Sequence, residues 1–171
     1  MSEMSSADLI ILLDLFEAHG IIVWLDGGWG VDALLGNQTR SHKDVDIVIA
    51  LDDIPKLQEI LAQKGFVVRE GIVPHSFVLA DPNGLEVDVH SAQFNERGDG
   101  IYRMQNGEDW IFTAEDLAGI GRIDGKVVKC LTAEAQVKGH AYGYVPAEKD
   151  FRDMQQLAER FGVFLPDQLK R

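Results

Sequence analysis

Two aspartates at the start of an apolar run constrain the fold more than any other feature of the sequence. Asp44 and Asp46 flank Val45, and the run continues through Ile49. In a β-strand, alternate side chains share a face, so both carboxylates project to one side while the aliphatic side chains project to the other. Such pairs also cap helices or solvate edges, but at the start of an apolar strand a charge gains nothing structurally. The run therefore predicts a strand that presents two carboxylates for chemistry.

A third carboxylate, Asp88, lies in a later apolar run at residues 85–90. The turn sequence at 81–84 joins this run to a strand expected at 76–80, because Pro presets φ and Asn-Gly supplies positive φ. Two carboxylates on one strand and a third from a neighbouring strand form a cage of hard oxygen ligands. Such a cage suits Mg²⁺ that holds a nucleoside triphosphate.

Two segments upstream of the aspartates are candidates for phosphate binding. Gly27 and Gly28 lie between an expected strand and an expected helix, where glycine lets the backbone approach a phosphate and the helix N-terminus offers free N–H groups. A plain tight turn is the alternative. The loop at 37–43 carries three potential cations, of which Arg40 is the best candidate for a triphosphate clamp. A solvated loop is the alternative there.

The remaining periodicity predicts helices and strands that alternate early in the chain and separate later. The order β-α-β-α-β-β-β indicates a mixed sheet with helices packed on it, an α+β fold. The expected elements are a helix from Ser5 or Ser6 to Gly20, a strand at 21–25, a helix at 29–35, a strand at 43–51, a helix from Asp52 or Asp53 to Gly65, strands at 66–68, 76–80 and 85–90, a loop at 95–107, a hairpin around Asp124 and Gly125, and two helical segments after Thr132, the second at 147–161.

Length and charge narrow the classes of partner. The chain has 171 residues, enough for one domain, and a formal net charge of −12. This charge argues against nucleic acid and anionic membranes as partners; it suits a small cationic substrate, or solubility alone. Cys130 is the only cysteine, which excludes an intrachain disulfide and offers no ligand spacing for zinc. With no signal peptide pattern and no apolar run long enough for a membrane span, we expect a cytoplasmic protein.

The sequence around these motifs resembles a known signature. Residues 24–36, followed by 39–46, are similar to drug-modifying nucleotidyltransferases of the polymerase-β type, in two groups: the small lincosamide nucleotidyltransferases and the aminoglycoside 2″-O-nucleotidyltransferases. Residues 86–90 and 119–121, and in the tail residues 140–143 and 148–150 with Asp153, resemble the lincosamide group more. The resemblance therefore covers nearly the whole chain.

This resemblance implies a fold and a reaction. The fold is the α+β polymerase-β-type nucleotidyltransferase, a mixed sheet with flanking helices plus a β-hairpin and a C-terminal helical extension. Residues 1–95 would form the nucleotidyltransferase core, and residues 96–171 would complete the substrate pocket within one compact unit. The reaction would move AMP from Mg-ATP to a drug hydroxyl and release pyrophosphate, with two Mg²⁺ ions expected.

The resemblance also assigns roles to residues. It maps metal ligation to Asp44 and Asp46 and the third carboxylate to Asp88, which we also expect to be the general base, with Glu86 as the fallback. It raises Lys149, otherwise an ordinary charge in the first turn of a helix, to a phosphate contact.

The acceptor is less constrained by the sequence. Glu86, His90 and Tyr102 are candidate substrate contacts, although the residues alone favour a His90 that ends its strand on the surface. The segments expected to line the pocket supply apolar side chains, which favour a lincosamide, and acids, which keep an aminoglycoside open. The apolar residues are Phe94, Ile101, Tyr102, Met104 and Trp110, and the acids are Glu96, Asp99, Glu108 and Asp109. Two further functions stay open, a protein-modifying nucleotidyltransferase of the antitoxin type and a non-catalytic homologue that only binds nucleotide. A homodimer is also left open.

Overall fold

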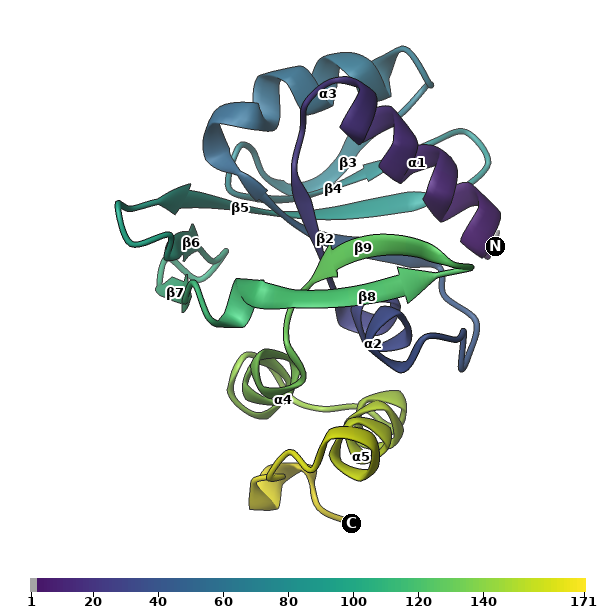
Figure 1. Ribbon diagram of the computed structural model, residues 1–171. Coiled ribbons are helices and arrows are strands. Elements are labelled where there is room, and N and C mark those ends of the chain that lie inside the picture. The colour runs from purple at the N-terminus through teal and green to yellow at the C-terminus, as the bar shows by residue number, and fades with distance from the viewer. Residues whose placement is uncertain (1–2) are drawn as a thin grey trace.

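A mixed sheet runs through the centre of the molecule, with helices on both faces (Figure 1). The structure is a computed structural model that describes residues 3–171. Within these residues seven strands follow the order β3-β4-β5-β2-β1-β9-β8, and β6 and β7 extend the sheet from β5. In chain order the elements are α1 (Ser6–Ala18), β1 (Val23–Asp26), α2 (Gly27–Leu35), β2 (Asp44–Ala50), η1 (Leu51–Asp53), α3 (Ile54–Ala62), β3 (Val67–Ile72), β4 (Ser76–Ala80), β5 (Glu86–Phe94), β6 (Gly100–Arg103), β7 (Asp109–Phe112), η2 (Asp116–Ala118), β8 (Gly119–Ile123), β9 (Lys126–Cys130), α4 (Ala133–Tyr142), α5 (Glu148–Phe161) and η3 (Asp167–Leu169).

One face of β2 packs into the core, and the other carries the two aspartates. Val45, Ile47 and Ile49 are fully buried in the main core, beneath α1 and α3. Asp44 and Asp46 project from the opposite face, on the side of the sheet where Figure 1 places α2, α4 and α5. The α+β fold with flanking helices and a C-terminal helical extension is thus confirmed. None of the helices in residues 3–171 is long and apolar enough to cross a membrane.

Three helices, α1, α2 and α4, begin at polar side chains that accept hydrogen bonds from N–H groups of the first turn. Ser5 and Asp8 form a capping box at the start of α1, so Ser5 rather than Ser6 is the cap. The second helix begins two residues earlier than expected. Asp26 accepts a hydrogen bond from Gly27 N at 2.7 Å and caps α2, which therefore includes Gly27 and Gly28 in its first turn.

Residues 95–107 are not a single loop, and this expectation was wrong. β6 lies within that range and pairs antiparallel both with the end of β5 and with β7. The strand has only four residues and is flanked by polar turns, so its apolar signal is too short to read from the sequence. This small hairpin brings Tyr102 beside Ala92 on β5. The two hairpins predicted from turn sequences, β4–β5 and β8–β9, lie where they were expected.

Candidate active site

Three aspartates stand level with one another on three adjacent strands. Asp26 on β1 pairs with Asp46 on β2 in the antiparallel register, and Asp46 pairs with Asp88 on β5 in the parallel register. Adjacent strands lie about 4.8 Å apart, so the register alone brings these side chains together. Asp44 lies on the same face of β2, one pleat away, level with Glu86. Asp26 is the member of this row to which sequence reasoning gave no role.

Ligand atoms suited to a cation converge within this row. One oxygen each of Asp46 and Asp88 and one ring nitrogen of His90 all lie within 4.8 Å of one another. Asp44 is not part of that group, although it lines the same cavity. Two carboxylates from neighbouring strands, with a third one pleat away, are the hard oxygen donors that Mg²⁺ prefers. The side chains present therefore fit a divalent metal, and ligation by Asp44 stays a prediction.

His90 stands between the two central carboxylates. Its Nε2 lies 3.5 Å from Asp46 Oδ1 and 3.7 Å from Asp88 Oδ1. Its Nδ1 lies 3.0 Å from the hydroxyl of Tyr102, and that hydroxyl donates to Ser76 Oγ at 2.8 Å. Burial lowers the pKa of His90, but the hydrogen bond to Asp46 and the charge of Asp88 raise the pKa well above its usual value. His90 therefore faces the site rather than ending its strand on the surface.

The carboxylates perturb one another strongly. Burial raises the pKa of Asp88 to about 6; the His90 charge opposes this, and Asp46 and Asp44 add to it. Burial, followed by the charge of Asp46, also raises the pKa values of Asp26 and Asp44. Burial acts to raise the pKa of Asp46 as well, but the hydrogen bond and charge of His90 outweigh it and the net pKa is lowered. A row of buried like charges of this kind is stabilised by a bound cation.

A cavity of about 600 Å³ opens over this row, a size that suits a drug-sized ligand. The sheet and the two C-terminal helices enclose it. Lys149, in the first turn of α5, lines the cavity and its charge lowers the pKa values of Asp44 and Asp46. Nearby, Asp150 is buried and accepts hydrogen bonds from the Tyr144 hydroxyl at 3.1 Å and from Ala147 N at 2.7 Å. The C-terminal helices therefore line the pocket together with the core.

Apolar side chains form another part of the cavity wall. Most come from the strands β6 and β7 and the turn between them, and one precedes α4; these are Tyr102, Met104, Trp110, Phe112 and Leu131. Ile101 points to the other face and is 38% exposed, so it is not part of the wall. None of the four acids that kept an aminoglycoside open lines the cavity. Asp109 instead pairs with Arg103, and Asp99 accepts a hydrogen bond from Ala114 N at 2.8 Å.

Glu86 is not brought into the cavity. It stands at the start of β5, and its carboxylate pairs with the guanidinium of Arg69 on the edge strand β3. The Glu86 side chain is therefore paired with Arg69 toward the edge of the sheet and does not join Asp88 in the cavity. Its expected roles as substrate contact and fallback base remain untested.

The glycine pair is required by the site's own side chains. A Cβ on Gly27, whose φ is +57°, would overlap the carboxylate of Asp46. A Cβ on Gly28 would come within 2.5 Å of both Arg40 Nη2 and the ring of His42. Both glycines line the cavity, so their backbone is also open to a ligand. Glycine is thus needed here for packing, and the expected phosphate contact remains a prediction.

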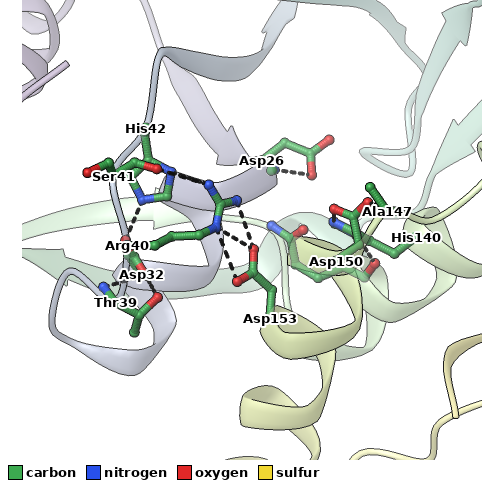
Figure 2. Close-up of polar contacts among 12 residues, drawn as sticks. Asp26, Asp32, Thr39, Arg40, Ser41, His42, His140, Ala147, Asp150 and Asp153 are labelled. Carbon is green, nitrogen blue, oxygen red and sulfur yellow. Dashed lines mark hydrogen bonds and ion pairs between the residues drawn. The ribbon is translucent and has the colours of Figure 1, made fainter. Parts of the chain in front are cut away.

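Arg40 lines the cavity but is held by the protein (Figure 2). Its Nη2 and Nε lie 2.9 and 3.1 Å from Asp153 Oδ2 on α5. Its Nη1 donates to Ser41 O at 3.2 Å and to His42 Nδ1 at 3.1 Å. Burial acts to lower the pKa of Arg40, but the hydrogen bond and charge of Asp153 raise the net pKa above its usual value. The triphosphate contact expected of Arg40 is therefore in competition with an internal ion pair.

Comparison with known proteins agrees with this geometry. A family profile described as aminoglycoside-2″-adenylyltransferase matches residues 8–157. The chain belongs to this family. It is 30% identical over 156 residues to a lincosamide resistance protein of Staphylococcus haemolyticus, covering 91% of this chain and 96% of that protein. It is 27% identical over 131 residues to a 2″-aminoglycoside nucleotidyltransferase of Escherichia coli, covering 77% and 70% of the two chains.

Solved structures of this family have the same fold. The lincosamide antibiotic adenylyltransferase LnuA, in its lincomycin-bound crystal structure, superposes with a TM-score of 0.80 at 28% identity, covering 91% of this chain and 98% of that one. A crystal structure of ANT(2″)-Ia in complex with adenylyl-2″-tobramycin gives a TM-score of 0.73 at 21% identity, covering 92% and 89%. The resemblance to drug-modifying nucleotidyltransferases is therefore confirmed, and the chain is an antibiotic nucleotidyltransferase of this family.

Some cavity residues of this family member were missed by sequence reasoning. Asp26 carried one usable signal: it ends an apolar run directly before the glycine pair, the position of a helix cap. His140 and Asp150 lie in the tail that carries the family resemblance but were given no role, and Tyr144 was not singled out, because the meeting of these residues depends on how α4 and α5 pack. In the structure His140 Nε2 lies 3.6 Å from Asp150 Oδ1, and all three residues line the cavity.

Proposed function

We propose that this chain moves AMP from Mg-ATP to a hydroxyl group of a lincosamide and releases pyrophosphate. The bond that forms joins the drug oxygen to the α-phosphorus, and the bond that breaks joins that phosphorus to the oxygen of the departing pyrophosphate. The reaction needs no redox partner, because it transfers only a nucleotidyl group and the proton of the hydroxyl and leaves every oxidation state unchanged. Because ATP is a substrate of the cytoplasm, we propose that the reaction takes place there.

The observation that carries the choice of acceptor is the composition of the cavity wall. A lincosamide has one amine and a large apolar share, so its pocket should combine aromatic and aliphatic walls with one or two acids. Beyond the three proposed metal carboxylates, the cavity has two acids, Asp26 and Asp150. Of these, Asp150 is buried and already accepts two hydrogen bonds. The aromatic and aliphatic part of the wall supports the lincosamide.

The catalytic carboxylates act by position and charge. Asp46 and Asp88, joined by Asp44, would hold divalent metal, of which we propose two ions. When bound, the metal neutralises the triphosphate and the charge that develops on the leaving group. Asp88 would take the proton of the attacking hydroxyl as general base; in the metal-free site burial raises the pKa of its carboxyl group to about 6.

The remaining cavity residues hold the two substrates. Lys149 offers a cation beside the carboxylates and would contact the phosphates. Gly27 and Gly28 expose the backbone at the start of α2 to the cavity; the Gly27 N–H is taken by Asp26, so the remaining N–H groups of the first turn and the positive end of the helix would favour phosphate. His90 and Tyr102 bond to each other at 3.0 Å and border the wall on which the drug would rest.

An aminoglycoside is the second candidate, and one observation favours it. Asp26 accepts a single internal hydrogen bond, from Gly27 N, and leaves an oxygen for a substrate amine. Calorimetric titration with lincomycin and with tobramycin, each with Mg²⁺ and a non-hydrolysable ATP analogue, separates the two. We expect lincomycin to bind and tobramycin to give no signal. The reverse result would overturn the lincosamide assignment, and binding of neither would favour a protein acceptor.

A further inference from the structure

A chain of four polar side chains joins α2, the loop before β2, and α5. It runs from Asp32 through His42 and Arg40 to Asp153, and Figure 2 shows the four lying in sequence between the helices. Asp32, His42 and Asp153 are 1%, 4% and 2% exposed. Buried ionisable groups destabilise a protein unless each is paired. The four linked side chains satisfy this requirement for one another.

The hydrogen bonds fix the state of His42. Arginine can only donate, so the 3.1 Å contact from Arg40 Nη1 makes His42 Nδ1 the acceptor. The proton of His42 is therefore on Nε2, which donates to Asp32 Oδ2 at 2.5 Å. The other oxygen of Asp32 accepts from Thr39 N at 3.1 Å and from Thr39 Oγ1 at 2.6 Å. The polar groups at this end of the chain are thus satisfied, and the loop is held in one conformation.

The guanidinium of Arg40 has little capacity left. It carries five N–H donors. Four of them are already used. Nε and Nη2 each donate one hydrogen bond to Asp153, and Nη1 donates one to Ser41 O and one to His42 Nδ1. A two-pronged contact with a triphosphate would require at least one of these four hydrogen bonds to open. Removing the partner from a buried Asp153 carboxylate would be strongly unfavourable.

Asp153 lies one helical turn from the phosphate-binding candidate on α5. Lys149 and Asp153 are four residues apart and so share one face of the helix. The rest of α5 is attached by apolar contacts of Met154 and Leu157, which are not directional, and by Asp150, which accepts from the Tyr144 hydroxyl at 3.1 Å and lies 3.6 Å from His140 Nε2. The ion pair with Arg40 is a directional contact that joins the Lys149 side of α5 to the loop before β2.

We propose that Arg40 is a positioning residue: through Asp153 it fixes α5 against the loop before β2 and thereby sets Lys149 opposite Asp44 and Asp46. The space for this contact is kept free by Gly28, because a Cβ there would lie 2.5 Å from Arg40 Nη2. The inference rests on the proposed function in one respect, the use of ATP. It is independent of the acceptor.

Asp153→Asn separates positioning from direct phosphate contact. If Arg40 bound the triphosphate directly, this variant would release the guanidinium and leave affinity for an ATP analogue unchanged or stronger. If Arg40 positions α5, Asp153→Asn and Arg40→Ala should each weaken analogue binding by about tenfold, and the double variant by no more than that. Arg152→Ala removes an exposed charge from the same helix and is the matched control; its affinity should equal that of the parent.

A second cycle tests the route through Lys149. In a Lys149→Ala background, Asp153→Asn should cause no further loss of affinity, whereas independent effects would add. Arg40→Lys keeps the charge but cannot make the two-pronged contact with Asp153, and it should recover part of the lost analogue affinity. It also replaces Arg40→Ala if that variant does not fold. Hydrogen exchange of the α5 amides should accelerate in Asp153→Asn. Unchanged analogue affinity in Asp153→Asn, or additive effects with Lys149→Ala, would overturn the proposal.

These measurements do not depend on the drug. Analogue binding is read by calorimetry without an acceptor, so a failure of lincomycin to react would refute the proposed acceptor and leave this result intact. If the parent protein bound no ATP analogue with Mg²⁺, the proposed function and the positioning of Lys149 would both be refuted.

Discussion

Asp46 and Asp88 stand side by side at the same level of two parallel strands, β2 and β5. Because neighbouring strands are about 4.8 Å apart, this register holds two carboxylates at a separation that suits one shared cation. A slip of one residue in either strand would turn its carboxylate into the core face. The metal site therefore depends on the strand register, which the buried Val45, Ile47, Val87 and Val89 secure.

The first prediction concerns the two aspartates of β2. Asp44→Asn and Asp46→Asn should each lower turnover by about 10²-fold or more, because an amide is a weaker ligand for the divalent metal that would neutralise the reacting phosphates. Both variants should keep the parent's circular dichroism and a cooperative melt. Asp52→Asn, which changes an exposed carboxylate just beyond the same strand, should keep full activity. Substantial turnover in a folded Asp44 or Asp46 variant would contradict the roles given to these residues.

The second prediction concerns the chemical step. Asp88→Asn should lower kcat far more than it raises the KM for ATP, since a general base acts in the transition state rather than in nucleotide binding. Steady-state kinetics at saturating drug separates the two effects. A change confined to the KM for nucleotide would make Asp88 a binding residue.

The third prediction is the ionisation of Asp88 in metal-free protein. Its pKa is raised from 3.8 to about 6, so the carboxyl is protonated below pH 6 and ionised above it. A bound cation favours the ionised form, so Mg²⁺ should move the midpoint to lower pH. Carbon NMR of the aspartate carboxyl groups, assigned with Asp88→Asn, measures both midpoints. A metal-free midpoint near 3.8, or one that Mg²⁺ leaves in place, would refute this description of the site.

Much of this site could be predicted from the sequence because its signals are local. Alternation around Asp44 and Asp46 specifies the face of one strand, and the turn at 81–84 specifies the hairpin that carries Asp88. Contacts between distant segments gave no such signal. Arg40 pairs with a residue 113 positions away, and a single sequence holds no trace of that partner.

Short or shared elements were also difficult to predict. The four residues of β6 lie between polar turns, so the strand that places Tyr102 in the cavity read as loop. The N-terminal boundary of α2 depends on Asp26, which both caps the helix and joins the carboxylate row. The sequence pattern around Asp26 fits a helix cap. Its place in the carboxylate row follows only from the pairing of β1 with β2.

The fourth prediction concerns the acceptor wall. Trp110 and Ile111 are neighbours on β7, but only Trp110 lines the cavity, while Ile111 is 52% exposed. Trp110→Ala should raise the KM for lincomycin about tenfold or more, since burial of a large side chain contributes about 1.5–3 kcal/mol, and it should leave the KM for ATP nearly unchanged. Ile111→Ala is the matched control and should change neither constant. Equal effects of the two variants would exclude this wall as the drug site.

The central claim is AMP transfer to a lincosamide hydroxyl, and mass spectrometry of the drug tests it most directly. Purified protein incubated with Mg-ATP and lincomycin should add the mass of one adenylyl group to the drug and release one pyrophosphate for each modified molecule. The product should be absent without ATP, without divalent metal, and with Asp46→Asn. Unmodified lincomycin under conditions in which tobramycin gains an adenylyl group, or in which neither drug changes while ATP is bound, would contradict the account.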